Sequence, residues 1–230
     1  MIGIIGAMAE EVQGLIQVME NVSVMEKASM TFHKGQLYKQ EVVVVRSGIG
    51  KVNAAVCAQI LIDEFAVETI INTGIAGSLD ERIDIGDMVI STDAVHHDMD
   101  ATIFGDPLGQ VPRMDTLYFP TDQGLAAKAK GVNEAVNPQI KTFLGRVASG
   151  DQFVSSKEKK AVIKESFGPL CVEMEGAAIA HVAYLNHCPC LIVRSISDKA
   201  DDSATEDYEV FEKKAVANST TFMRSLIERW

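Results

Sequence analysis

Residues 1–19 read MIGIIGAMAEEVQGLIQVM, and this stretch decides the fold class. Residues 2–5 form a short apolar, β-branched run that ends at Gly6, as is typical of a strand buried on both faces. Glu10 and Glu11 follow, and acidic residues are favoured in the first turn of a helix, so a helix is predicted from about residue 10 to 19. A buried strand, a glycine turn and a helix in this order predict the first unit of an α/β domain.

The same pattern recurs along the chain. Further buried strands are predicted at residues 42–45, 69–72, 88–90, 144–148 and 191–193, and further helices at residues 52–65, 176–185 and 206–230. In the first of these helices Val52, Val56, Ile60 and Phe65 fall near one stripe, which we expect to face the core. The repetition predicts one domain over residues 1–230, an α/β fold whose central sheet is mixed, largely parallel, twisted and flanked by helices.

Composition excludes several classes of function. The chain carries 21 Lys and Arg against 32 Asp and Glu, a net charge of −11, so it lacks the basic field that nucleic acid binding needs. Cys57, Cys171, Cys188 and Cys190 form no CxxC pair, and no metal site is predicted. The glycine turns complete neither GxxxxGK[ST] nor GxGxxG, so no cofactor is predicted. No uncharged run reaches the ~20 residues of a membrane span, and the apolar N-terminus lacks a basic flank, so we expect a cytoplasmic protein that contacts no membrane.

Three predicted strand ends carry both glycine and an acidic residue. In open α/β sheets the ligand cleft lies beyond the carboxyl ends of the strands, where Glu11, Glu175 and Asp198 fall. Each has an alternative structural explanation, since Glu11 and Glu175 could cap helices and Asp198 could cap a helix or pair with Arg194. Three acids around one cleft together indicate acid and base catalysis.

The sequence resembles the 5′-methylthioadenosine/S-adenosylhomocysteine nucleosidase family of the purine nucleoside phosphorylase superfamily. The motifs that carry the resemblance run in order over nearly the whole chain: GIIGAM at 3–8 with EE at 10–11, SGIGKV at 47–52, NTG at 72–74, SGD at 149–151, VEME at 172–175 and RSISD at 194–198. The resemblance implies hydrolysis of the N-glycosidic bond of 5′-methylthioadenosine and S-adenosylhomocysteine, and of 5′-deoxyadenosine, in methionine salvage and the recycling of S-adenosylmethionine by-products.

The resemblance also implies a role for each acid. Asp198 matches the acid that protonates the leaving adenine, which requires a raised pKa. Glu11 matches the residue that aligns and deprotonates water, and Glu175 the residue that binds the ribose 2′ and 3′ hydroxyls, whose hydrogen bonds tighten as charge develops on the sugar. Ser197 and Arg194 resemble residues that support the acid.

Further positions match the family's substrate-binding residues. Met174 matches a residue against the sugar, Phe153 an aromatic that stacks on adenine, and Val154 a position whose backbone meets the base edge. Met8, Ile49 and Tyr208 match the pocket for the 5′ group. The predicted binding set is completed by Ala76, Gly77 and Glu173.

Residues 98–122 hold several glycines, prolines and aromatics, and predict a long ordered loop. Within it, Phe104 matches a residue donated across a dimer interface into the neighbouring site, so the resemblance implies a homodimer. The chain departs from the family at Ile75, where many relatives carry Ser, and at residues 106–109, where many carry a Tyr-containing sequence.

Three other functions stay open. A close relative that cleaves 6-amino-6-deoxyfutalosine in menaquinone synthesis would use the same acids. A purine nucleoside phosphorylase would need donors for phosphate, whereas the first loop offers Glu10 and Glu11. A nucleoside sensor with an inactive site would be expected to lack one of the acids.

Overall fold

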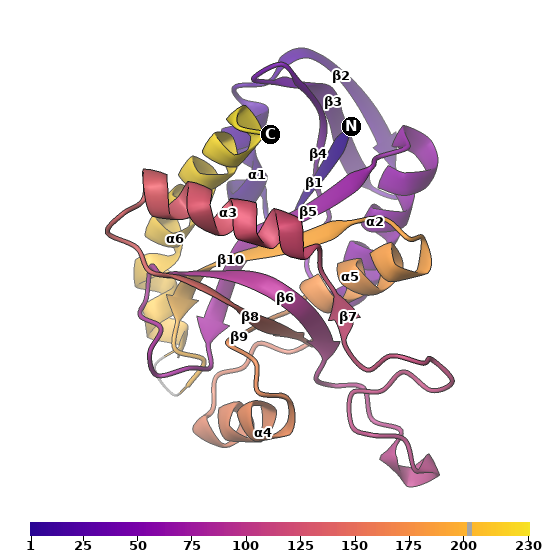
Figure 1. The fold of residues 1–230 in the computed structure, drawn as a ribbon, viewed down its shortest axis with the longest axis vertical. Helices are drawn as coiled ribbons and strands as arrows, with labels where there is room; N and C mark the ends of the chain where they lie inside the picture. The colour runs from indigo at the N-terminus through magenta and orange to yellow at the C-terminus, as the bar shows by residue number, and fades with distance from the viewer. Residues whose placement is uncertain (202–203) are drawn as a thin grey trace.

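The computed structural model describes residues 1–201 and 204–230, and the side chains of these residues except 204–209. Its strands are β1 (Ile2–Gly6), β2 (Glu20–Lys27), β3 (Met30–Leu37), β4 (Gln40–Arg46), β5 (Thr69–Ser78), β6 (Met88–His96), β7 (Phe119–Pro120), β8 (Thr142–Ser149), β9 (Cys171–Glu173) and β10 (Cys190–Asp198). Its helices are α1 (Ala9–Ile16), α2 (Lys51–Phe65), α3 (Gln123–Val136), α4 (Lys157–Phe167), α5 (Gly176–Leu185) and α6 (Ala204–Glu228), with a short 3-10 helix η1 (Thr102–Phe104). Figure 1 shows the strands curving through the centre with helices on both sides.

All of these strands belong to one mixed sheet. The order is β10-β6-β8-β9-β5-β1-β4-β3-β2, β7 pairs with β6, and β10 also pairs with β5, so that part of the sheet closes on itself. Strands β4, β1, β5 and β10 are joined by parallel pairings, which brings their carboxyl ends to one edge. The predicted α/β fold with a central mixed sheet flanked by helices is confirmed, and this edge is where the predicted acids lie.

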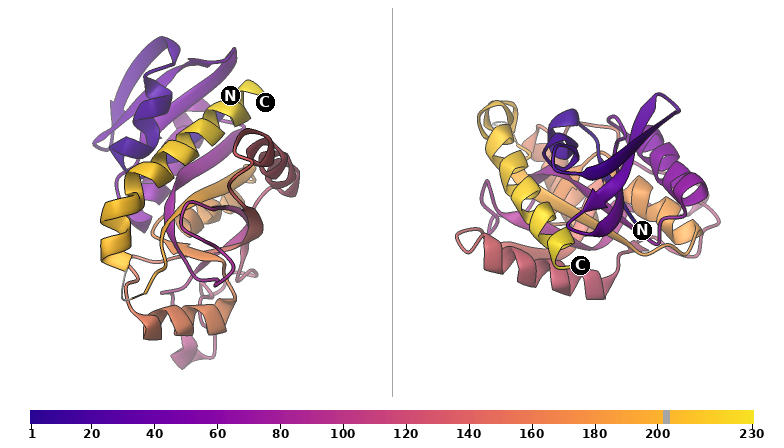
Figure 2. Two further views of the ribbon diagram at one scale, coloured as in Figure 1. Left: turned by 90° about the vertical axis from the view of Figure 1, so that its left-hand side faces the viewer. Right: turned by 90° about the horizontal axis from the view of Figure 1, so that it is seen from above.

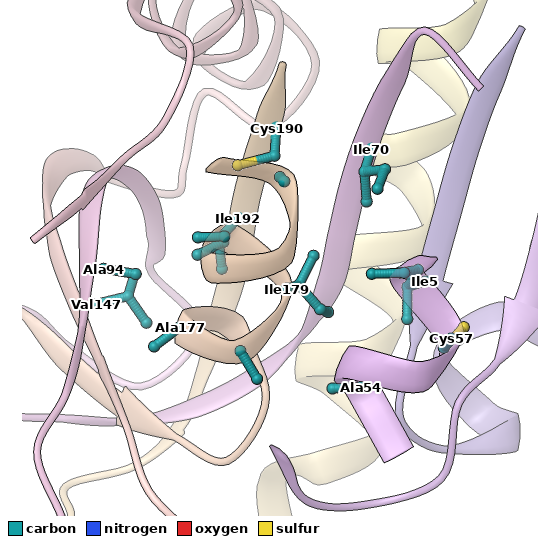
Figure 3. Packing of buried hydrophobic residues seen from close by; sticks show 14 of the residues in the cluster. Ile5, Ala54, Cys57, Ile70, Ala94, Val147, Ala177, Ile179, Cys190 and Ile192 are labelled. Atoms are coloured by element: carbon teal, nitrogen blue, oxygen red, sulfur yellow. The ribbon is translucent and has the colours of Figure 1, made fainter. Parts of the chain in front are cut away.

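Helices cover both faces of the sheet, which explains why its central strands are continuously apolar. One buried cluster joins α2 and α5 to the sheet, and Figure 3 shows Ile179 of α5 between Ile192 of β10 and Ile5 of β1. A second cluster packs α1, α3 and α6 against the other face. The long α6 runs along that side of the molecule in both views of Figure 2.

The predicted face of helix α2 was right at Ile60 and Phe65 and wrong at Val52 and Val56. Ile60 is 8% exposed and Phe65 packs against the core, whereas Val52 is 74% exposed and Val56 39% exposed. The small side chains of Ala54, Cys57 and Ala58 are buried as well, and they allow close approach of α2 to α5.

The predicted long loop at residues 98–122 contains only η1 and β7 as regular structure. It projects from the body beyond β7 at the lower right of Figure 1. Among the residues that the structure describes, no helix is both long and apolar enough to cross a bilayer.

Candidate active site

The three predicted acids converge on one cavity of about 240 Å³. It opens at the carboxyl edge of the sheet, and each acid is less than 10% exposed. The described residues that line it are Ala7, Met8, Glu11, Ile49, Ile75, Ala76, Gly77, Phe153, Val172, Glu173, Met174, Glu175, Ser197 and Asp198. Most of the wall is apolar, and the acids supply the polar groups that a small ligand would meet, as is usual for ligand sites.

Glu11 lies in the first turn of α1 and both caps this helix and faces the cavity. Its Oε2 accepts hydrogen bonds from the amides of Ala7 (2.7 Å) and Met8 (3.0 Å), and its Oε1 accepts one from the amide of Ile75 (3.2 Å) on β5. Burial raises the pKa of Glu11, against the lowering effect of Arg194 and of these amides. A fixed carboxylate whose pKa is raised is suited to accept a proton from water.

Glu175 occupies the position before α5 and reaches across to the loop after β4. Its Oε1 accepts a hydrogen bond from the amide of Gly50 at 2.8 Å. Burial, followed by the charge of the neighbouring Glu173, raises the pKa of Glu175 to about 8. The carboxyl group is therefore held in place by the main chain of Gly50, which is 125 residues away in sequence, and its pKa is raised by burial and by Glu173.

Asp198 ends β10 and is 3% exposed. Its Oδ2 accepts a hydrogen bond from the hydroxyl of Ser197 at 2.9 Å, and its Oδ1 accepts one from the amide of Ala200 at 2.8 Å. Gly77 on the adjacent β5 leaves the room that this carboxyl needs, because a Cβ at that position would lie 2.6 Å from Oδ1. Both oxygens are thus positioned by their own strand end.

The predicted support of Asp198 by Arg194 is corrected by the structure. The side chain of Arg194 is 1% exposed and does not line the cavity; it forms an ion pair with Glu173 and a hydrogen bond to the side-chain oxygen of Asn72. A register irregularity lies between Ile196 and Asp198 on β10, and the guanidinium of Arg194 is directed to the neighbouring Glu173. Although burial opposes its charge, Glu173, Glu175 and Glu11 raise the pKa of Arg194.

Glu173 is the anionic partner of this buried pair. It accepts hydrogen bonds from the hydroxyl of Ser149 and from the amides of Glu175 (3.0 Å) and Gly176 (2.8 Å). Burial acts to raise its pKa, but Arg194 and Ser149 outweigh burial, and the pKa of Glu173 is lowered. The site therefore combines one carboxyl group kept ionised with two whose pKa values are raised, a separation typical of sites that perform acid and base chemistry.

The structure places most of the other predicted binding residues at the cavity. Met8, Ile49, Ala76, Gly77, Phe153, Glu173, Met174 and Ser197 line it, and Val154 lines a small adjoining cavity. Phe153 is 50% exposed and Ile49 is 54% exposed, so both stand at the mouth of the cavity. Phe104 is 86% exposed and does not line the cavity of its own chain. The side chain of Tyr208 lies outside the described residues.

Sequence analysis assigns no role to several residues that build the site, although each lies in a quoted motif. Ala7 and Val172 line the cavity, but their apolar side chains give no signal that separates them from core residues. Asn72 and Ser149 hold the buried ion pair, and each is a polar residue that follows or ends a predicted apolar run, which was an available signal. In the described part of the chain no group of His, Cys, Asp and Glu side chains is arranged to hold a metal ion.

Comparisons with known proteins agree with this geometry. The sequence profile of the phosphorylase superfamily matches residues 1–228. The 5′-methylthioadenosine/S-adenosylhomocysteine nucleosidase of Staphylococcus haemolyticus is 42% identical over 229 residues, which are 99% of each chain. The nucleosidase of the same name from Neisseria meningitidis, solved with methylthio-immucillin-A, superposes with a TM-score of 0.95 at 38% identity, covering 100% of this chain and 99% of that one. The futalosine hydrolase of Helicobacter pylori superposes with a TM-score of 0.94 at 35% identity, covering 100% and 97%. This chain therefore belongs to the phosphorylase superfamily and, within it, to the 5′-methylthioadenosine/S-adenosylhomocysteine nucleosidases.

Proposed function

We propose that this protein hydrolyses the N-glycosidic bond of 5′-methylthioadenosine and S-adenosylhomocysteine, and also that of 5′-deoxyadenosine, and releases adenine. The observation that carries the proposal is the convergence of Glu11, Glu175 and Asp198 on one largely apolar cavity. The two products, adenine and the 5′-substituted ribose, would be recycled in methionine salvage.

The reaction follows from the placement of the acids. Asp198 donates a proton to the five-membered ring of adenine, so the base leaves as a neutral molecule when the bond to ribose breaks. A water molecule attacks the oxocarbenium-like sugar and gives its proton to Glu11, whose raised pKa favours proton uptake. Glu175 binds the ribose hydroxyls, and these hydrogen bonds strengthen as positive charge develops on the ring.

The cavity favours water over phosphate as the nucleophile. None of the described residues that line it is basic, and its acids would repel a phosphate ion. If adding phosphate gave a sugar 1-phosphate and raised turnover, the hydrolase proposal would be refuted.

The direct test is to incubate the protein with 5′-methylthioadenosine, S-adenosylhomocysteine, 5′-deoxyadenosine and 6-amino-6-deoxyfutalosine and to measure the adenine released from each. The fourth substrate is included because the likeness to the futalosine hydrolase of Helicobacter pylori supports it as a second candidate. Asp198→Asn should abolish release from every substrate that the enzyme cleaves and still bind nucleoside, because the amide keeps the shape of the carboxyl group and lacks its proton. Unchanged turnover in this variant would contradict the mechanism.

We also propose that the protein is a homodimer in which Phe104 completes the partner's cavity. Ile103 and Phe104 are 87% and 86% exposed on the projecting loop, and Val52 adds a further exposed apolar side chain on α2. The two adjacent apolar side chains at the end of a projecting loop support a role of this loop in contacting a partner. The four free cysteines are consistent with a cytoplasmic location, which we propose on that ground.

A further inference from the structure

The first turn of α2 receives its caps from distant parts of the chain. Gly50, the residue before the helix, has a φ of +96° and no capping side chain, so the first amides of α2 need acceptors from elsewhere. The amide of Gly50 donates to Oε1 of Glu175, and the amide of Lys51 donates to Oδ1 of Asp151, each at 2.8 Å. Two adjacent amides therefore bind the carboxyl groups of two side chains, one inside the site and one outside it.

Asp98 contacts both Lys51 and Asp151. It accepts hydrogen bonds from the Lys51 ammonium at 2.5 Å and from the amide of Asp151 at 2.9 Å. The side chains of Lys51 and Asp98 are 19% and 17% exposed, so the ion pair is largely shielded from solvent. Burial opposes the charge of Asp98, but Lys51 and the amide of Asp151 lower its pKa. Asp98, Lys51 and Asp151, here called the loop triad, join the loops that follow β6, β4 and β8.

No member of the loop triad lines the cavity. Lys51, however, follows Gly50 in the chain, and the amide of Gly50 donates the hydrogen bond that holds Glu175. We propose that the loop triad is a positioning device for Glu175: it fixes the start of α2 so that the Gly50 amide holds the Glu175 carboxyl in the orientation that binds ribose. The inference rests on the proposed function, because it assigns Glu175 to the sugar hydroxyls.

Glycine at position 50 makes such a device necessary. Its positive φ is a conformation that side-chain-bearing residues rarely adopt, and the backbone there is free of the restraint that a Cβ imposes. The Ile49 carbonyl of the same peptide unit accepts a hydrogen bond from the side-chain amide of Asn53 at 2.7 Å. The next residue, Lys51, is held by Asp151 at the main chain and by Asp98 at the side chain, and these contacts restrain the Gly50 amide from its other side. Loss of either contact lets the amide and Glu175 shift together.

The test is a comparison of Asp151→Ala with Asp151→Asn. The alanine variant removes the acceptor for the Lys51 amide, whereas asparagine keeps an oxygen at that position. We expect kcat/KM for 5′-methylthioadenosine to fall about tenfold to a hundredfold in Asp151→Ala, mostly through kcat, because a displacement of about 1 Å in a positioned group costs up to about a hundredfold. Asp151→Asn should recover most of this loss.

A double-mutant cycle separates positioning from a general structural role. In a Glu175→Ala background, measured by single turnover with enzyme in excess, Asp151→Ala should cause less than about a threefold further loss, because the group that it positions is gone. Additive losses would overturn the inference, as would wild-type activity in Asp151→Ala or equal losses in the alanine and asparagine variants.

The matched control is Asp93→Ala. Asp93 and Arg146 form an ion pair with both side chains 22% exposed, close to the exposure of the Lys51–Asp98 pair, and neither lines the cavity. This variant should keep wild-type kcat/KM. Asp98→Ala should act in the same direction as Asp151→Ala and serves in its place if the latter does not fold. If the wild-type enzyme releases no adenine from any nucleoside, the proposed function fails; if it does and the triad variants match Asp93→Ala, only the positioning inference fails.

Discussion

Replacing Arg194 by methionine should strongly destabilise the protein, although Arg194 does not line the cavity. The side chain is 1% exposed and is paired with Glu173, which is 7% exposed. Methionine is similar in length and apolar, so the change removes the charge and the hydrogen bonds and leaves most of the volume filled. An ionised Glu173 would then remain buried beside the other acids of the site.

The expected magnitude follows from the burial of the pair. Removing one partner of a buried ion pair costs about 3 to 5 kcal/mol in the free energy of unfolding, because the other charge is left uncompensated. For a chain of this length 1 kcal/mol corresponds to about 2 to 4 °C in Tm, so we expect a decrease of about 6 to 20 °C. In the wild type the folded-state pKa of Glu173 is below the ordinary value of 4.5, so its ionisation stabilises the fold above that pH.

Without Arg194, burial is no longer opposed and the folded-state pKa of Glu173 should rise above 4.5. The deficit in the variant should therefore be larger at pH 8 than at pH 5, where a proton takes over part of the role of the guanidinium.

Urea unfolding of both proteins at pH 5 and pH 8, followed by circular dichroism, measures this difference. The double variant Glu173→Gln/Arg194→Met is the control, because a neutral glutamine still accepts hydrogen bonds from Ser149 and the α5 amides. It should recover much of the stability lost at pH 8. A loss below about 1 kcal/mol at pH 8, or an equal loss at both pH values, would refute the reasoning.

Three further predictions concern other parts of the site. The pKa of Glu175 is about 8 in the fold against 4.5 ordinarily, so the folded state holds an extra proton and its stability falls as pH rises from 4.5 to 8. Urea unfolding of Glu175→Gln should show a smaller decline rather than none, because the raised pKa of Glu11 still contributes; an equal decline in both proteins would contradict this prediction. In Gly77→Ala the new Cβ would lie 2.6 Å from Oδ1 of Asp198, so adenine release should fall about a hundredfold while the circular dichroism spectrum is retained. Because Phe104 is proposed to complete the partner's cavity, Phe104→Ala should raise KM for 5′-methylthioadenosine while the circular dichroism spectrum is retained; an unchanged KM would count against a shared site.

Most of the central strands could be predicted from sequence because their burial on both faces demands continuous apolar runs; β8, which is buried only over its last three residues, is apolar enough to be predicted as well. All six predicted strands lie within β1, β4, β5, β6, β8 and β10. The hairpin of β2 and β3 escaped prediction for the opposite reason. β2 is exposed along nearly its whole length and carries polar residues, and β3 alternates buried residues such as Phe32 with exposed ones such as Lys34.

The acids themselves could be found from sequence, since the ends of parallel strands meet at one edge and Glu11, Glu175 and Asp198 follow such ends or start the adjoining helix. Their helix-capping alternative was also informative, because Glu11 does cap α1 while it faces the cavity. Because a carboxyl group has two oxygens, Glu11 can accept hydrogen bonds from the amides at the start of α1 and still face the cavity, so helix capping and catalysis did not exclude each other.

Which side chains form ion pairs and hydrogen bonds with one another was decided only by the tertiary structure. Arg194 lies four residues before Asp198 on the same strand, yet it pairs with Glu173, because neighbouring strands place that carboxylate and Asn72 within reach of the guanidinium. The link from Asp151 to the amide of Lys51 joins residues 100 positions apart in the same way. The sequence by itself determined which chemical groups lie at the edge of the sheet, because strand ends follow from local periodicity. The order and register of the strands decided which of these groups contact one another, because both depend on residues far apart in the chain.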